Sequence, residues 1–166
     1  KLKGTYRYLT NFNKGLVSKK NVSHHYDISE KLYDLFLDSS RQYSCAYFKN
    51  TDESLEEAQE NKVNHIIKKL NIKANQKVLD IGSGWGTLAI NLAQKTKASV
   101  TGITLSKNQL EYCNNKVKEL NLGNQVEFKL MDYREIDETF DRIVSVGMFE
   151  HVGRKFYKSY FKIVSK

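Results

Sequence analysis

The sequence predicts an α/β fold in which parallel strands alternate with helices that cross over the sheet. Two observations carry this prediction. From residue 77 onward, short apolar runs rich in Val and Ile alternate with segments whose apolar residues recur at helical spacing. A glycine-rich turn at 80–86 joins the first strand to the first of these helices. The chain has 166 residues, 40% of them hydrophobic, which suits one domain, or part of one, with a substantial core.

The N-terminal third is predicted to be irregular. Residues 1–23 carry six basic and no acidic residues and are expected to form an extended arm. A helix is predicted over 30–38. Its apolar residues share one face: Leu32, Leu35 and Phe36. The aromatic-rich stretch 41–49 lacks helical spacing and is expected to be a loop.

A long helix should begin after Ser54, which can form a capping box with Glu57. Its apolar stripe is Leu55, Ala58, Val63, Ile66, Ile67 and Leu70. The predicted strands are 77–81, 99–104, 125–130 and 140–146, and the predicted helices are 87–94, 107–120 and one from about 154. A fourth strand at the margin would leave an apolar sheet edge, which natural proteins avoid. We therefore expect either more chain or a partner, such as a second copy in a homodimer, to cover it.

The net charge of +8 indicates an anionic partner, and basic residues gather at both ends of the chain. Anionic lipid head groups stabilise membrane binding by roughly 1 kcal/mol for each basic residue at the surface. Nucleic acid is not expected, because no nucleic-acid motif accompanies the charge. A solvated basic surface is the alternative. No apolar run is long enough to span a membrane, and two cysteines favour a reducing, cytoplasmic setting. The basic ends of the chain favour peripheral membrane association in that setting.

The glycine-rich turn has the order D-x-G-x-G-x-G, beginning at Asp80. A dinucleotide fingerprint has G-x-G-x-x-G instead. The order found here resembles that of S-adenosylmethionine (SAM) methyltransferases, in which the turn lies behind the amino-acid end of the cofactor. We therefore expect a Rossmann-like SAM-dependent methyltransferase fold, with Asp80, Gly82, Ser83 and Gly84 at the cofactor.

Ligands of such sheets lie beyond the carboxyl ends of the strands, where the loops 82–86, 104–109, 131–134 and 147–151 should meet. The amide of Gln109 could hold ribose hydroxyls, or it could close a capping box with Ser106. Asp132 and Tyr133 lie where an adenine edge would be, or they are ordinary loop residues.

Glu150 and His151 follow the fourth strand, where an acceptor substrate should meet the methyl group. Adjacent side chains usually diverge, so we favour Glu150 as the acid–base group and His151 as a structural donor. A charge at a helix start is the alternative for Glu150. No metal site is expected.

Seven stretches, in this order along the chain, resemble the cyclopropane-fatty-acyl-phospholipid synthase family, which includes the mycolic acid cyclopropane synthases. They are 25–27 (HYD), 43–48 (YSCAYF), 55–59 (LEEAQ), 78–86 (VLDIGSGWG), 101–106 (TGITLS), 132–134 (DYR) and 147–153 (GMFEHVG). Each stretch alone is weak, whereas the ordered set, which runs from about residue 11 to the end, is specific.

The resemblance implies SAM-dependent transfer of a methylene group to the cis double bond of a phospholipid acyl chain. The cofactor residues that it implies are Tyr43 and Ser44, the turn 82–84, the ribose-side loop with Thr104, Leu105, Ser106 and Gln109, and Tyr133 and Arg134 beside the adenine. It also implies a bicarbonate ion, with Cys45 and Glu150 around it. Tyr26, Tyr43, Tyr47 and Phe149 could line the acyl channel, or they could be ordinary core residues.

Two departures from the family pattern qualify this expectation. Ser83 stands where many relatives have Cys, and the sheet of the family has seven strands, so this chain resembles a truncated form with the sheet incomplete at its C-terminal side. We divide it into a basic arm with an N-terminal helical cap (1–53) and a partial SAM-binding core (54–166). Two other functions stay open: N-methylation of a small amine, and a non-catalytic membrane-binding fragment.

Overall fold

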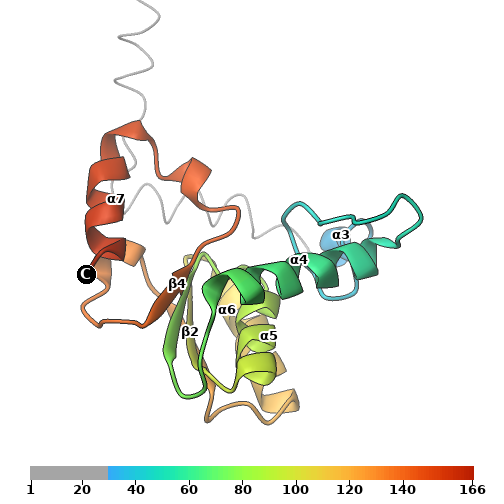
Figure 1. Cartoon of the computed structure of the whole chain (residues 1–166), viewed down its shortest axis with the longest axis horizontal. Coiled ribbons are helices and arrows are strands. Elements are labelled where there is room, and N and C mark those ends of the chain that lie inside the picture. Colours follow the sequence, from blue (N-terminus) through green and yellow to red (C-terminus); the bar gives the residue numbers. More distant parts are fainter. Residues whose placement is uncertain (1–29) are drawn as a thin grey trace, which may run out of the picture.

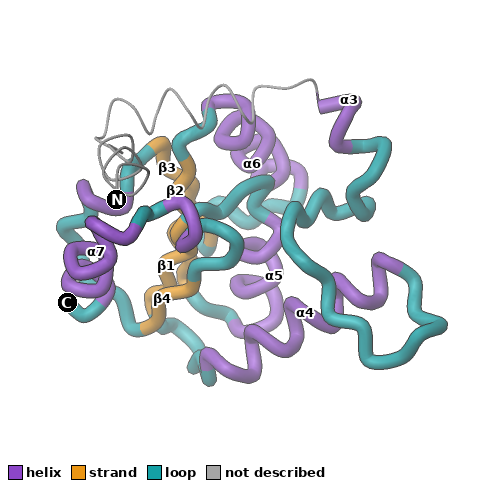
Figure 2. Tube along the Cα trace, turned by 90° about the horizontal axis from the view of Figure 1, so that it is seen from above, coloured by secondary structure: helices purple, strands orange, loops and turns teal. Residues whose placement is uncertain are grey.

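The structure is a computed structural model that describes residues 30–166; the predicted arm at 1–23 and the 25–27 stretch, with Tyr26, lie outside them. In the described part (Figure 1), four parallel strands form one sheet, and their order β3-β2-β1-β4 can be followed in Figure 2. The strands are β1 Lys77–Ile81, β2 Ser99–Thr104, β3 Val126–Leu130 and β4 Arg142–Val144. The predicted parallel α/β sheet is confirmed, although β4 is shorter than expected.

Helices cover both faces of the sheet, and Figure 2 shows the strands between α7 and the other helices. One face is covered by α4 Leu55–Leu70, α5 Thr87–Thr96 and α6 Lys107–Glu119. The other is covered by α7 Tyr157–Val164 and by the 3-10 turns η1 Tyr133–Glu135, η2 Phe149–His151 and η3 Arg154–Phe156. Successive residues of β1 alternate between the layers: Val78 packs on the α4–α6 side, whereas Leu79 and Ile81 pack on the α7 side.

Helix α4 begins where the sequence predicts. The Ser54 hydroxyl accepts from the Glu57 N–H at 3.3 Å, and the Glu57 carboxylate accepts from the Ser54 N–H at 2.8 Å. This is the predicted capping box, which satisfies two backbone donors at the helix start. In the apolar stripe of α4, Ile66, Ile67 and Leu70 pack on the sheet layer, Ala58 and Val63 are buried, and Leu55 is exposed. Within residues 30–166, every helix is too short or too polar to cross a lipid bilayer.

The predicted helix over 30–38 is wrong in length and in its buried face. Helix α3 ends at Tyr33, and its bounds are Glu30–Tyr33. Leu32, Leu35 and Phe36 are exposed, whereas Tyr33 is buried with its ring 5.4 Å from that of Trp85. Beyond the helix, the Asp38 carboxylate accepts from the backbone N–H groups of the next residues, and such local side-chain bonds compete with helix formation.

The ring of Phe128 on β3 occupies space that two glycines leave free. A Cβ at Gly102 on β2 would lie 2.5 Å from this ring, and a Cβ at Gly86 would lie 2.7 Å from it. Gly86 also has φ +83°, which disfavours any side chain there. The absence of Cβ atoms at both positions therefore lets the start of α5 lie close to the sheet.

Strand β4 forms one margin of the sheet, as expected, because it pairs only with β1 among the described strands. A cavity of about 230 Å³ lies beside it. Its lining includes Leu79, Ile81, Phe140, Ile143, Ile163 and Val164. The predicted apolar edge is thus present, although charged residues such as Arg142 and Lys166 also line the cavity.

Substitution of Gly102 by Ala tests the packing on Phe128. We expect Gly102→Ala to lower the free energy of unfolding by about 1–3 kcal/mol, because the added methyl group overpacks the ring contact. Gly123→Ala is the matched control, since a Cβ there meets nothing within 4 Å and its φ is not positive. Urea unfolding measures both variants. Equal losses of unfolding free energy in the two would contradict the packing argument.

Candidate functional site

The turn after β1 is held against the end of β2. The N–H groups of Gly82 and Ser83 both donate to the carbonyl of Ile103, at 3.0 and 2.9 Å. Gly82 and Gly84 have φ values of +79° and +54°, which favour glycine. A Cβ at Gly84 would meet no described atom within 4 Å, so the backbone there faces open space. A Cβ at Gly82 would instead lie 2.8 Å from the side chain of Met148. Gly84 is thus the point of the turn that a ligand can approach.

Asp80, the last acidic residue before the turn, is 2% exposed. Its Oδ2 atom is buried and has no hydrogen-bond partner among the described residues. Burial raises the pKa of the Asp80 carboxyl to about 7, because the charged form loses its hydration. A buried acceptor without a donor suits a ligand that brings N–H groups or a positive charge.

The loop after β2 closes on itself. The hydroxyl of Thr104 donates to Gln109 Oε1 at 2.8 Å, and the Ser106 hydroxyl accepts from the Gln109 N–H at 3.3 Å. All three side chains are buried, and Leu105 between them is half-buried. Ser106 therefore caps α6, while the Gln109 amide bonds Thr104 instead of completing the capping box. The predicted ribose contact of Gln109 stays a prediction.

Asp132 and Arg134 form a local pair after β3. The Asp132 carboxylate accepts from the Arg134 backbone N–H at 3.0 Å and from its Nε at 2.8 Å. This bonding holds the pKa of the Arg134 guanidinium above its usual value. Tyr133 between them is half-buried, with its ring 5.2 Å from that of Tyr160. The buried member is thus Asp132, and Tyr133 and Arg134 keep partial access to solvent.

The segment with Tyr43, Ser44 and Cys45 lies against the loop after β4. A Cβ at Gly147 would lie 3.8 Å from Ser44 Cβ and 4.0 Å from the Tyr43 carbonyl oxygen. Tyr43 is 53% exposed and packs edge-on against Tyr33, and Cys45 is exposed. The structure therefore brings two of the predicted loops together beside the turn, where Gly82 meets Met148.

Glu150 and His151 lie in η2, and both are exposed. Their neighbour Phe149 stacks on Tyr157 at 4.7 Å and packs on α7, which favours the core reading of this residue. Tyr47, another predicted channel residue, stacks on His65 at 5.0 Å. In residues 30–166, the His, Cys, Asp and Glu side chains form no group of three that could hold a metal ion.

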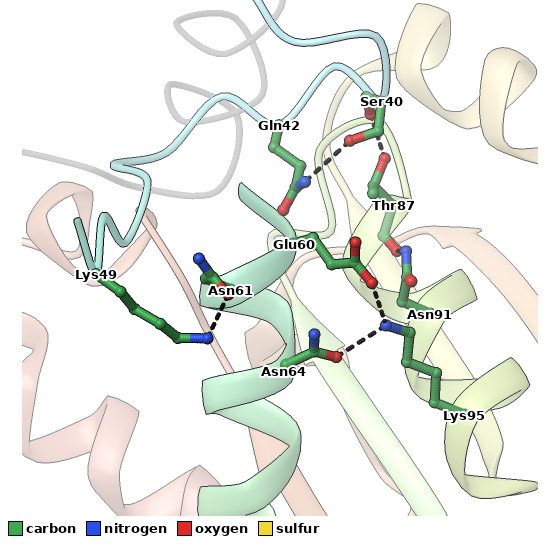
Figure 3. Close-up of polar contacts among 9 residues, drawn as sticks. All are labelled: Ser40, Gln42, Lys49, Glu60, Asn61, Asn64, Thr87, Asn91 and Lys95. Carbon is green, nitrogen blue, oxygen red and sulfur yellow. Dashed lines mark hydrogen bonds and ion pairs between the residues drawn. The ribbon is translucent and has the colours of Figure 1, made fainter. Parts of the chain in front are cut away.

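Sequence reasoning missed the contacts that fix the 34–49 segment on the core. The Arg41 guanidinium lies 5.1 Å from the Trp85 ring and 4.6 Å from the Tyr112 ring, and it bonds the Asp34 carboxylate. The Ser40 carbonyl accepts from the Thr87 hydroxyl at the start of α5 (Figure 3). Figure 3 also shows Lys95 of α5 bonded to Glu60 and Asn64 of α4. No pattern along the chain marks these pairs; the cation–aromatic chemistry of Arg41 is the one signal that could have indicated them.

Substitution of Asp80 tests the burial of this carboxyl. Its folded pKa is raised, so its contribution to stability is complete at low pH and is lost as pH rises through about 7. We expect Asp80→Asn to match the wild type near pH 4 and to be more stable near pH 8.5, by on the order of 1–3 kcal/mol. Thermal unfolding at both pH values measures this. Asp137→Asn, at an exposed position, is the control; an equal pH response in both variants would contradict the buried assignment.

Comparison with known proteins gives a consistent result for sequence and fold. The family model for mycolic acid cyclopropane synthetase matches residues 14–166. The cyclopropane-fatty-acyl-phospholipid synthase of Escherichia coli (strain K12) is 44% identical over 155 residues, which cover 91% of this chain and 39% of that protein.

Two solved structures extend the comparison. Mycolic acid cyclopropane synthase CmaA1, complexed with SAH and CTAB, aligns with a TM-score of 0.85 and 37% identity over 89% of this chain and 52% of its own. Coclaurine N-methyltransferase, bound to N-methylheliamine and SAH, aligns with a TM-score of 0.68 and 30% identity over 85% of this chain and 45% of its own. The chain spans about half or less of the length of these relatives. It belongs to the mycolic acid cyclopropane synthetase family and has the Rossmann-like fold of SAM-dependent methyltransferases.

Proposed function

We propose that this chain forms the SAM-binding part of an enzyme that converts the cis double bond of an unsaturated phospholipid acyl chain into a cyclopropane ring. One observation carries the proposal: the glycine turn, the Tyr43–Ser44 segment and the loop after β4 adjoin one another in a chain of this family. The relative solved with SAH, the demethylated form of SAM, supports the cofactor.

The residues present fit SAM. The open space over Gly84 would admit the amino-acid end, and the unpartnered acceptor of Asp80 suits a molecule with an ammonium group and a positively charged sulfur. Ser83 would act by shaping the turn, because its hydroxyl and its N–H both donate to the Ile103 carbonyl, at 3.3 and 2.9 Å. The remaining assigned contacts are Tyr43 and Ser44, the loop with Thr104, Leu105, Ser106 and Gln109, and Tyr133 and Arg134.

When bound, SAM supplies a methyl group on a cationic sulfur. The acyl double bond would take this methyl group from the sulfur, and ring closure would then require a base that removes one proton from the added carbon. Glu150 and Cys45 flank the contact between Gly147 and Ser44 in sequence, which supports their assignment around that proton. They would hold a bicarbonate ion, which supplies the base.

A second candidate keeps the cofactor and changes the acceptor to a small amine. The likeness to coclaurine N-methyltransferase, at 30% identity, supports it. In that reading Glu150 or His151 would take the proton of the amine. The products of the two reactions differ, so one experiment separates them.

We also propose peripheral binding to an anionic membrane surface on the cytoplasmic side. Residues 151–166 contain no acidic residue, and Lys158 and Lys162 of α7 are exposed beside Phe161, which is 56% exposed. Basic residues with an exposed aromatic ring suit anionic head groups. We expect co-sedimentation with phosphatidylglycerol vesicles, and a loss of it in Lys158→Glu/Lys162→Glu. Equal sedimentation with purely zwitterionic vesicles would refute the electrostatic part.

Lipid mass spectrometry tests the proposed reaction. Cells that express the complete protein should gain acyl chains that are one CH₂ group heavier than their unsaturated precursors and that resist hydrogenation. Glu150→Gln should lower this product by at least about 100-fold, because the proton acceptor loses its orientation. Its affinity for S-adenosylhomocysteine should stay within about twofold, a change of less than 0.5 kcal/mol.

The matched control is Glu56→Gln, at an exposed position in the first turn of α4. It should keep full product formation. A methylated amine with unchanged lipids would favour the second candidate. A large loss of cofactor affinity in Glu150→Gln would refute the role assigned to this residue.

A further inference from the structure

One face of α4 holds the segment that carries Tyr43, Ser44 and Cys45. The Gln59 side-chain NH₂ donates to the carbonyls of Gln42 and Ser44, at 3.2 and 3.1 Å. The Tyr47 N–H donates to the carbonyl of Ala58 at 3.0 Å. These bonds hold the backbone of residues 42–47 against α4.

Lys62 stands one turn further along the same face. Its Nζ donates to the Ser44 hydroxyl at 2.7 Å. Among the described residues, Ser44 is the only member of the segment whose side chain bonds Nζ. Lys62 is half-buried, and burial lowers the pKa of its ammonium to about 8. Asp38 and Cys45, both from the 34–49 segment, oppose this shift because negative charge near the ammonium favours the protonated form.

The loop after β4 bounds the segment on its other side. A Cβ at Gly147 would touch Ser44 Cβ and the Tyr43 carbonyl oxygen, at 3.8 and 4.0 Å. Ser44 thus lies between the Lys62 ammonium and the loop that leads to Glu150. A shift of Ser44 away from α4 would carry Tyr43 and Cys45 with it, because the three are consecutive.

We propose that Lys62 is a positioning residue for the cofactor: its protonated amino group, aided by Gln59, holds Ser44 and so keeps Tyr43 and Cys45 in their binding positions. The proposal rests on the proposed function, since it takes SAM as the ligand that Tyr43 and Ser44 contact. Lys62 itself is not assigned any contact with the cofactor.

The charge of Lys62 argues for a role beyond packing. Its ammonium is partly desolvated, which is unfavourable for the folded protein, and a Met side chain of similar length would avoid that cost. Lys62→Met should therefore unfold at the same or a higher temperature than the wild type. A Lys retained only for stability would show the opposite result.

Calorimetric titration with S-adenosylhomocysteine tests the proposal. At pH 7 we expect Lys62→Met to bind about tenfold more weakly than the wild type, the worth of one charge-assisted hydrogen bond. Lys68→Met, at an exposed position of the same helix, should bind as the wild type does. Amide hydrogen exchange without ligand should be faster over residues 42–47 in Lys62→Met, since the Tyr47 N–H loses protection.

The pH profile separates charge from shape. Below about pH 8 Lys62 is protonated, so wild-type affinity should fall as pH rises through this value, whereas Lys62→Arg should retain its affinity because a guanidinium stays charged. Cys45 is present in both proteins, so the difference between the two profiles reports Lys62. This comparison also decides the matter if Lys62→Met does not fold.

Three outcomes are distinct. If the wild type does not bind S-adenosylhomocysteine, the proposed function fails. If the wild type binds and Lys62→Met binds equally well, the function stands and the role of Lys62 is refuted. Parallel pH profiles for the wild type and Lys62→Arg would refute the requirement for the protonated amino group.

Discussion

The contact of the Phe128 ring with two bare glycine Cα atoms is the constraint on which the site depends. Gly102 belongs to the sheet and Gly86 to the start of α5, so one ring fixes the distance between them. A Cβ at Gly86 would also lie 2.8 Å from the sulfur of Cys113, whose thiol donates to the Gly84 carbonyl at 3.5 Å. The turn is thus supported before any ligand arrives, and a preformed backbone lowers the entropy cost of binding. The third glycine of the motif serves packing, and Gly84 serves access.

The same packing explains why the pKa of the Asp80 carboxyl is raised. Its side chain points to the α5–α6 side of the sheet, as that of Val78 does, where close-packed apolar groups exclude water. A carboxyl there is unfavourable to ionise. Burial likewise raises the pKa of the Cys113 thiol to about 12, and the nearby Asp80 carboxylate adds to this effect. Cys113 is therefore inert, as expected for a core thiol. The carboxyl lowers the stability of the core, and a cationic ligand would offset that loss only when it is bound.

Sequence alone predicted the sheet better than the 34–49 segment, for a physical reason. The bounds 77–81 and 99–104 are those of β1 and β2, because apolar runs between turn residues report local structure directly. The predicted helix over 30–38 is wrong because the Tyr33 ring contacts Tyr43 and Trp85, which are distant in the sequence. These contacts outweigh the helical spacing of the apolar residues. In the site, the motif positions predicted that the loops after β1 and β4 lie close together, as Gly82 and Met148 do. The direction of the Gln109 amide depends on Thr104, five residues earlier, and no sequence pattern predicts it.

Helix α4 connects the sheet layer to the 34–49 segment, and it contacts each of them with a different face. Its apolar face packs on the sheet layer through Ile66, Ile67 and Leu70, and full burial of such a side chain would contribute roughly 1.5–3 kcal/mol. Its polar face bonds the 34–49 segment through Gln59 and Lys62, and desolvation of the Lys62 ammonium offsets the stabilisation from its bond to Ser44. The segment exposes Leu35, Tyr43 and other apolar side chains and so gains little from burial. Because polar bonds are directional and burial is not, α4 fixes where Ser44 lies more than how firmly the segment is attached.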